Sequence, residues 1–103
     1  MNKIKNIQNI KKIIIKPKVH CYCPLGKDWY DMQLYIKIKV ADYYPDYCDI
    51  RTFINEKIQG KEMIIEDVLY TVKNFIETYE VKKVTVKGVV DMIDSHPPVE
   101  VTI

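Results

Sequence analysis

Three cysteines supply the strongest nucleophiles of this 103-residue chain, and one of them, Cys23, precedes a Pro–Leu–Gly segment. A thiol attacks as its thiolate, so a nucleophilic cysteine needs a neighbour that takes its proton. Asp28 follows Cys23 by five residues across Gly26, which is close enough for an acid/base partner. We expect these residues in a constrained loop before the first long strand. Taken alone, they favour a simpler interpretation: an inert, buried Cys23 with Asp28 capping a turn.

A second carboxylate, Glu66, falls near the start of the most regular predicted helix, beside the apolar residue Ile65. A carboxylate there gains slightly from the helix dipole, which is a sufficient structural reason for it. It also presents two adjacent acceptors, which suit the N–H and amino edge of a guanine-like ring. The position of Glu66 alone leaves both interpretations open.

Zinc is a further possibility, because histidine and cysteine are its usual ligands. The available residues are His20, Cys21, Cys23 and His96. The Cys-x-Cys spacing is tighter than in most zinc sites and no second cysteine pair follows. We therefore predict no metal site and keep zinc as the less favoured alternative.

Hydrophobic periodicity predicts the elements that must position these residues. Residues 32–40 alternate apolar and polar side chains and indicate a strand with one buried face. Pro45 indicates a turn over residues 41–46, and a short second strand is expected to approach Cys48. Asp49 is a suitable N-cap for a helix over residues 50–58, with Gly60 at its left-handed end.

A second helix is predicted over residues 63–79, where apolar residues recur at helical spacing. Residues 83–87 and 99–103 alternate as strands. The order is strand, strand, helix, helix, strand, strand (ββααββ), which predicts an α+β fold with an antiparallel sheet and two helices on one face. Such a small sheet has two open edges that can pair with a neighbour, so we expect a homo-oligomer.

Composition limits the class of protein. The net charge of +2 is too small to indicate nucleic-acid or membrane binding. Residues 1–18 carry six lysines and no acid, so we assign them to a basic N-terminal extension, with a further strand around residues 13–16. This extension could contact RNA, although a solvated leader is the simpler interpretation. Residues 19–103 are predicted to form one domain. No signal peptide is recognisable and the cysteine count is odd, so we expect a reducing, cytoplasmic location.

Residues 23–29, Cys-Pro-Leu-Gly-Lys-Asp-Trp, resemble the Cys-Pro…Gly…Asp-Phe signature of the 7-cyano-7-deazaguanine (preQ0) nitrile reductases, shortened by two residues. Glu66 falls where that family carries its substrate-binding glutamate, at the start of the second helix. The resemblance spans roughly residues 21–103 and is to the unimodular type of the family, which has the tunnelling fold.

The resemblance implies a function. Cys23 would attack the nitrile carbon to form a covalent thioimide, Asp28 would be the general acid/base, and Glu66 would anchor the deazaguanine. NADPH would reduce the thioimide to the aminomethyl product, a precursor of queuosine in tRNA. In that family the sites lie between the subunits of a homo-oligomer. The cofactor-side motif falls on Asp49, Arg51 and Thr52.

The chain departs from the family on the cofactor side. The last lysine of the cofactor motif is Ile54, the histidine before the substrate glutamate is Ile65, and the Arg-Gly-Gly stretch near the C-terminus is absent. Two alternatives therefore stay open. One is NADPH-independent addition of ammonia to a nitrile carried on tRNA, as in archaeal relatives of the reductases. The other is a non-catalytic purine- or pterin-binding protein of the same fold.

Overall fold

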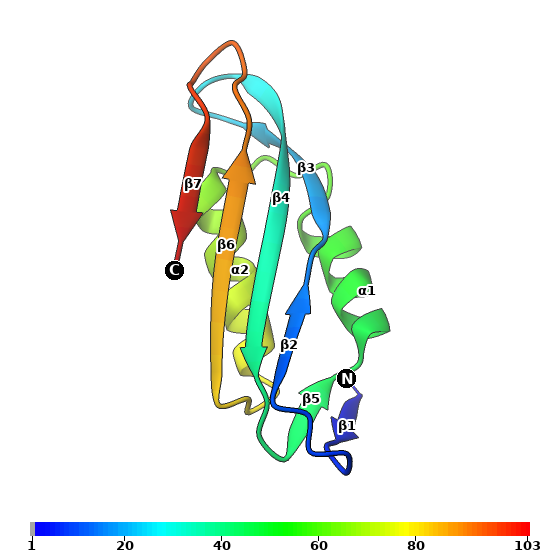
Figure 1. The fold of residues 1–103 in the computed structure, drawn as a ribbon. Coiled ribbons are helices and arrows are strands. Elements are labelled where there is room, and N and C mark those ends of the chain that lie inside the picture. Colours follow the sequence, from blue (N-terminus) through cyan, green and yellow to red (C-terminus); the bar gives the residue numbers. More distant parts are fainter. Residues whose placement is uncertain (1) are drawn as a thin grey trace.

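Strand β4 (Asp28–Lys39) is the longest strand and runs through the middle of the main sheet in the computed structural model, which describes residues 2–103 (Figure 1). Every second residue of β4 from Tyr30 to Ile38 is buried, and the residues between are exposed or half-buried. This is the alternation expected over residues 32–40, and the strand begins four residues earlier than predicted.

All strands of the main sheet are antiparallel to their neighbours. β3 (Lys18–Cys23) and β2 (Lys12–Ile15) both pair with one side of β4, and the chain passes between them at residues 16 and 17. β6 (Lys83–Val90) pairs with the other side of β4, and β7 (Val99–Thr102) pairs with β6 at the far edge. The expected strands at residues 83–87 and 99–103 are therefore present.

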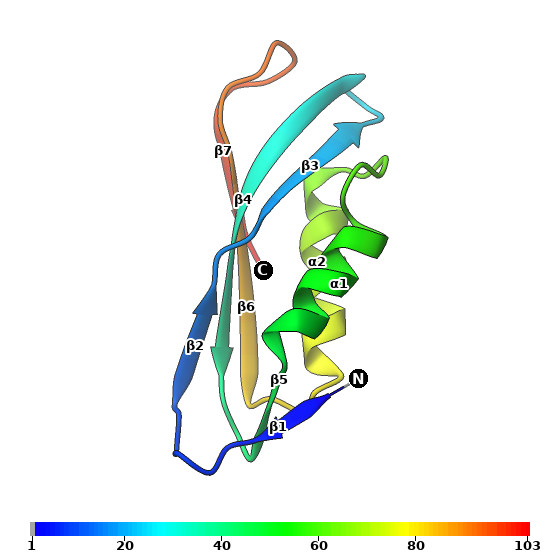
Figure 2. The same cartoon turned by 90° about the vertical axis from the view of Figure 1, so that its right-hand side faces the viewer.

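Two helices cover one face of this sheet and leave the other face open (Figure 2). α1 (Tyr47–Lys57) buries Ile50 and Ile54, and α2 (Ile65–Glu77) buries four apolar residues at helical spacing. These side chains meet the inward-facing residues of β3, β4 and β6 in one hydrophobic core. The predicted α+β architecture, with both helices on one face of an antiparallel sheet, is confirmed.

The first hairpin differs from the expected one. We expected the strand at residues 32–40 to pair with a short strand approaching Cys48; instead β4 pairs with β3, which precedes it. The short strand exists as β5 (Tyr43–Pro45), but it pairs with β1 (Lys3–Lys5) in a separate two-stranded sheet. β3 was overlooked because its inward residues include Cys21 and Cys23, which make its alternation less obvious.

α1 also begins earlier than predicted. Its N-cap is Asp46, whose Oδ1 accepts a hydrogen bond from the backbone N–H of Cys48 at 2.9 Å, and Asp49 lies inside the first turn. Asp46 and Asp49 are both suitable capping residues, and Pro45 directly before Asp46 ends β5, which fixes the earlier start. Gly60 follows the helix at φ 72°, the left-handed conformation expected for it.

The basic N-terminal segment contributes to the sheet. The strand expected around residues 13–16 is present as β2, in which Ile13 and Ile15 are half-buried against the core. β1 lies further toward the N-terminus, beside β5 at the base of the molecule (Figure 1). The division into an extension and a domain stays a prediction. Across residues 2–103, neither helix has the length and apolar character required to cross a bilayer.

Candidate active site

Cys23 and Asp28 face each other across a hairpin. Cys23 is the last residue of β3 and Asp28 the first of β4, and the two are paired in register. The expectation that Cys23 lies in a loop is therefore wrong, because β3 extends up to it. Both residues share the sheet face of Cys21 and Tyr30, which is the face toward the helices. Residues paired in this way have Cβ atoms about 4.5–5.5 Å apart, so the two side chains start from neighbouring positions on this face.

The turn that joins them, residues 24–27, holds the thiol at its entrance. The backbone N–H of Gly26 donates to Cys23 Sγ at 3.4 Å, and the N–H of Trp29 donates to Asp28 Oδ1 at 3.0 Å. The loop between β6 and β7 packs on the same turn: a Cβ added to Gly26 would lie 2.7 Å from Ser95 Oγ. Ser95 therefore packs on the turn that follows the thiol, a neighbour that the spacing of the sequence did not reveal.

Glu66 reaches the same end of the sheet through the connection between the helices. Residues 60–63, here called the strap, run beside β3 like an additional strand. Gly60 N–H donates to the carbonyl of His20, and Tyr22 exchanges backbone hydrogen bonds with Lys61 and Met63 at 3.0 and 2.9 Å. The strap leads directly into α2, whose first turn carries Glu66 as an exposed side chain.

Tyr30 lies between these groups and was not among the predicted site residues. It is 2% exposed, it pairs with Cys21 in register, and its hydroxyl donates to the carbonyl of Met63 at 2.5 Å. Burial raises the pKa of the Tyr30 phenol most, and negative charge at Cys21, then at Cys23 and Glu66, raises it further. Its hydrogen bond to Met63 links β4, the strand of Asp28, with the segment that leads into α2. A tyrosine at an inward position of an alternating strand was the available sequence signal.

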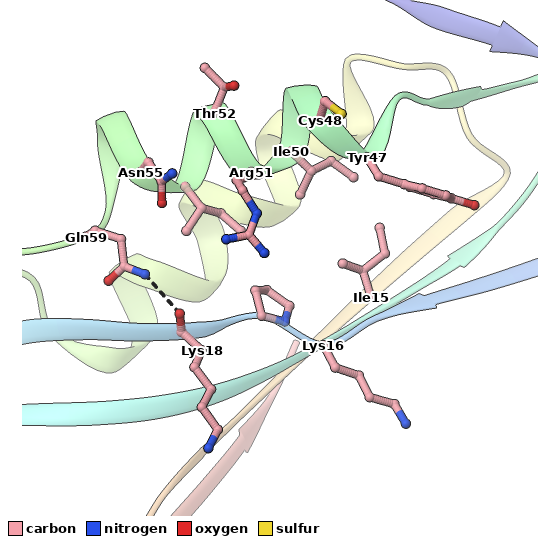
Figure 3. Close-up of a pocket in the computed structure, with 12 residues that line it drawn as sticks. Ile15, Lys16, Lys18, Tyr47, Cys48, Ile50, Arg51, Thr52, Asn55 and Gln59 are labelled. Carbon is pink, nitrogen blue, oxygen red and sulfur yellow. Dashed lines mark hydrogen bonds between the residues drawn. The ribbon is translucent and has the colours of Figure 1, made fainter.

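The three residues predicted on the cofactor side do not converge. A groove of about 830 Å³ lies between α1 and the junction of β2 and β3, and Arg51 points into it while Thr52 points away from the strands (Figure 3). Asp49 is engaged elsewhere: its Oδ2 accepts from the hydroxyl of Tyr79 at 3.4 Å and from the backbone N–H of Asn2. Ile54, which replaces the last lysine of the motif, is 4% exposed and packs in the core.

The groove offers little to a phosphorylated dinucleotide. Lys16 and Lys18 line it, but their ammonium groups extend away from α1, and Lys18 meets Gln59 through its carbonyl (Figure 3). Among the residues drawn in Figure 3, the guanidinium of Arg51 is the cation that points into the groove. This donor set does not fit a ligand that carries several phosphate charges.

The four residues that could have bound zinc do not share one surface. Cys21 is buried and its thiol donates to the carbonyl of Ile58 at 3.3 Å. His20 projects from the opposite face of β3, where its ring stacks on Trp29 and bonds Asp31 at 2.7 Å. His96 bonds the carbonyl of Pro97. Cys21 and His20 therefore cannot bind one ion together.

The molecule has two grooves whose lining does not include Cys23, Asp28 or Glu66. The larger is the groove beside α1, and a second, of about 450 Å³, lies on the open face of the sheet around His20 and Asp31. The thiol, carboxyl and Glu66 instead occupy one exposed end of the sheet. A ring bound there would need further walls to be enclosed.

Comparison with protein-family models gives no match, and comparison with the sequences of curated proteins gives none either. Among solved structures, the chain is similar to the apo form of the archaeosine synthase QueF-Like. The TM-score is 0.81 at 14% sequence identity, and the similarity covers 92% of this chain and 93% of that chain. At this identity the likeness establishes the fold alone: the chain has the tunnelling fold, as the resemblance of residues 23–29 and Glu66 implied.

Proposed function

We propose that this protein is an enzyme that attacks the nitrile of a 7-cyano-7-deazaguanine through Cys23. The observation that carries the proposal is the pairing of Cys23 with Asp28 across the β3–β4 hairpin, with both side chains on the helix face. A thiol and a carboxyl side by side supply a nucleophile and a proton carrier in one place. The match to the family signature and the shared fold support the choice of substrate.

The covalent step balances within these two residues and the substrate. Asp28 accepts the thiol proton of Cys23, and the sulfur forms a bond to the nitrile carbon. The π electrons of the C≡N bond move to nitrogen, which takes the proton back from Asp28. The product is a neutral thioimide, whose C=N carbon accepts a second nucleophile more readily than the free nitrile does.

Glu66 is proposed to hold the ring. Its exposed carboxylate lies on the first turn of α2, three residues after Met63, whose carbonyl accepts the hydrogen bond from Tyr30. Two adjacent oxygens can accept hydrogen bonds from the N–H and the amino group of the deazaguanine. A ring held at that edge would present its substituent toward the hairpin.

The thioimide can react further in two ways. In the first, two hydrides and two protons would be added and the C–S bond would break to leave an aminomethyl group; a bound NADPH would be the source of the hydrides. In the second, ammonia adds to the carbon and the C–S bond breaks to leave an amidine, with no cofactor and with the nitrile carried on tRNA. Both release the thiolate of Cys23.

The surroundings of the groove favour the second fate. The groove holds one cation directed inward, and Ile54 stands where the family has a lysine. Lys18, at the groove, and Cys23 are five residues apart on one strand, which is about 17 Å at the usual rise per residue. A dinucleotide in that groove would have to extend along the whole of β3 to reach the thiol of the same chain. The archaeosine synthase described above supports the same choice.

The test is the intact mass of the pure protein mixed with 7-cyano-7-deazaguanine, with no cofactor added. We expect one adduct of the ligand's full mass on wild-type protein and none on Cys23→Ala. Cys48→Ala is the matched control, because Cys48 is exposed on α1 and should leave the adduct unchanged. Addition of ammonia or of NADPH to the adduct then distinguishes the two fates by the mass of the product.

An adduct that persists in Cys23→Ala would contradict the assignment of the nucleophile. A folded wild-type protein that binds the deazaguanine without forming an adduct would instead support the non-catalytic purine- or pterin-binding alternative. If the adduct forms only when the nitrile is presented on tRNA, the free base is not the substrate.

A further inference from the structure

The buried side chain of Tyr30 lies at the candidate site, but the proposed reaction gives it no part. It lies on β4 two residues after Asp28, on the same face, and is 2% exposed. Its hydroxyl is directed at the strap, where it donates to the carbonyl of Met63 at 2.5 Å. A buried hydroxyl with a short hydrogen bond to a backbone carbonyl holds two elements in one relative position.

The strap it holds determines where α2 begins. The N-cap of α2 is Ile64, whose side chain makes no capping hydrogen bond, so α2 is not fixed by a cap of its own. The strap is fixed from two directions instead. Along its edge, Tyr22 bonds the backbone of Lys61 and Met63; from beneath, Tyr30 bonds the carbonyl of Met63. Met63 is thus the last anchored residue before the first turn of α2.

We propose that Tyr30 is a positioning residue that sets the distance between Glu66 on α2 and Cys23 on the β3–β4 hairpin. The inference rests on the proposed function, because it gives Tyr30 the task of aligning ring recognition with the nucleophile. Tyr30 joins β4, which continues from the hairpin, to the residue three positions before Glu66. A shift of the strap would therefore move Glu66 while Cys23 stays in place.

The protonation of Tyr30 agrees with this role. Burial, with the nearby charges, raises the pKa of the phenol, so the hydroxyl keeps its proton at neutral pH and stays a donor. The acceptor is a carbonyl, which has no proton to give. Tyr30 is therefore held as a permanent donor to Met63 and takes no part in the proton transfer.

Tyr30→Phe removes the hydroxyl and keeps the ring. We expect about tenfold weaker binding of 7-cyano-7-deazaguanine, the size typical of one lost buried hydrogen bond. The rate at which iodoacetamide modifies the peptide containing Cys23 should change by less than about twofold. Tyr79→Phe is the matched control, because Tyr79 is also buried and its hydroxyl bonds Asp49 at the other end of α2. Its binding should be unchanged.

A double-mutant cycle separates positioning from general destabilisation. Glu66→Gln should weaken binding about tenfold or more in the wild-type background and less than about twofold in the Tyr30→Phe background. Independent effects of the two substitutions would overturn the proposal. So would wild-type affinity in Tyr30→Phe.

Hydrogen exchange of residues 61–69 gives a readout that needs no ligand. Exchange should be about tenfold faster in Tyr30→Phe and unchanged in Tyr79→Phe; unchanged exchange in Tyr30→Phe would overturn the proposal. If wild-type protein does not bind the deazaguanine, the proposed function fails, and this exchange experiment still decides the role of Tyr30 in placing α2. If Tyr30→Phe does not fold, the hydroxyl proton of wild-type Tyr30 is observed by NMR instead. Slow exchange of that proton supports the hydrogen bond to Met63, and rapid exchange overturns it.

Discussion

At the scale of single residues, the same strand face that buries Cys21 exposes Cys23. Cys21 is fully buried, whereas Cys23 lies two residues further along β3, where the sheet ends and the thiol becomes half-exposed. Nucleophilic chemistry needs an accessible sulfur, so the end of β3 is where a cysteine can both react and be held by a rigid strand. The difference between the two cysteines is one of depth along the strand, and not of residue type.

The proposed role of Glu66 in ring binding predicts the effect of its substitution. Glu66→Ala should weaken binding of the deazaguanine by about 1.5–3 kcal/mol, the range for hydrogen bonds to a charged group. Asp67→Ala is the matched control, since Asp67 is the next exposed acid in the same first turn of α2. Isothermal titration calorimetry measures both affinities. Equal losses at the two positions would indicate a general effect of negative charge at the helix start and would contradict ring recognition by Glu66.

At the scale of elements, α2 carries Glu66 and is positioned by close packing on the sheet. Gly88 of β6 lies beneath α2, and a Cβ added there would come within 2.5 Å of Met32 Sδ and 3.0 Å of Leu69 Cδ2. The glycine thus lets a helix side chain and a strand side chain meet over β6. The depth at which α2 lies on the sheet depends on this contact.

Gly88→Ala should lower the free energy of unfolding by about 1–3 kcal/mol, the usual cost of overpacking a core. Urea denaturation followed by circular dichroism measures the change. Met32→Val removes the sulfur that the new methyl group would meet, so Gly88→Ala should cost clearly less in that background. The same cost in both backgrounds would show that Met32 is not the obstacle.

Tyr79, just after α2, bonds Asp49 in the first turn of α1. Its phenol makes the free energy of unfolding depend on pH. Burial, together with Asp49, raises the pKa of Tyr79 from 10.0 to about 12. Below pH 10 the folded and unfolded states both hold the phenolic proton, and the contribution of this group to stability is complete. Between pH 10 and about 12 the unfolded state loses the proton first, so stability falls as the pH rises.

The free energy of unfolding should therefore decrease less steeply over this range in Tyr79→Phe than in wild-type protein. The difference is at most about 1.4 kcal/mol per pH unit, the limit for a single proton. Tyr30 acts in the same direction and is retained in both proteins, so its contribution cancels in the comparison. Parallel pH profiles for the two proteins would contradict the hydrogen bond between Tyr79 and Asp49.

At the scale of the whole molecule, the sheet has two open edges. β2 forms one edge and β7 the other, while the edge of β3 is covered by the strap. Cys23, Asp28 and Glu66 lie at an exposed end of the molecule and line neither of the grooves described above. Assembly of several copies through these edges would supply the missing walls of the site, which makes the expected homo-oligomer a specific proposal.

Substitution at the β7 edge tests this proposal. Ile103 exchanges backbone hydrogen bonds with Val86 of β6, so by the alternation of an antiparallel pair the N–H of Thr102 points outward. Thr102→Pro removes that outward donor and keeps the bonds to β6. We expect wild-type protein and Thr102→Ala to sediment as a multiple of 12.2 kDa and Thr102→Pro to shift toward the monomer. A wild-type monomer at micromolar concentration would contradict assembly.

The local pattern of the sequence was sufficient for the elements whose periodicity is long and regular. The alternation of residues 32–40 and the helical spacing of residues 63–79 predicted β4 and α2, and with them the α+β architecture. Cys23, Asp28 and Glu66 were predicted as site residues by type and by resemblance to a family signature, and their roles stay a prediction. Periodicity works for these elements because burial of one face repeats along each of them.

Only the tertiary structure decided how these elements meet. β3 pairs with β4 because six residues of one strand match six of the other in register, and that match brings Cys23 opposite Asp28. The strap lies beside β3, and Tyr30 reaches Met63, through contacts between residues that are 33 and more positions apart in the chain. Hydrogen bonds of this kind depend on the relative position of distant backbone segments, which leaves no trace in local spacing. For that reason the sequence was sufficient to predict Cys23 as the nucleophile, whereas its placement opposite Asp28 is visible only in the fold.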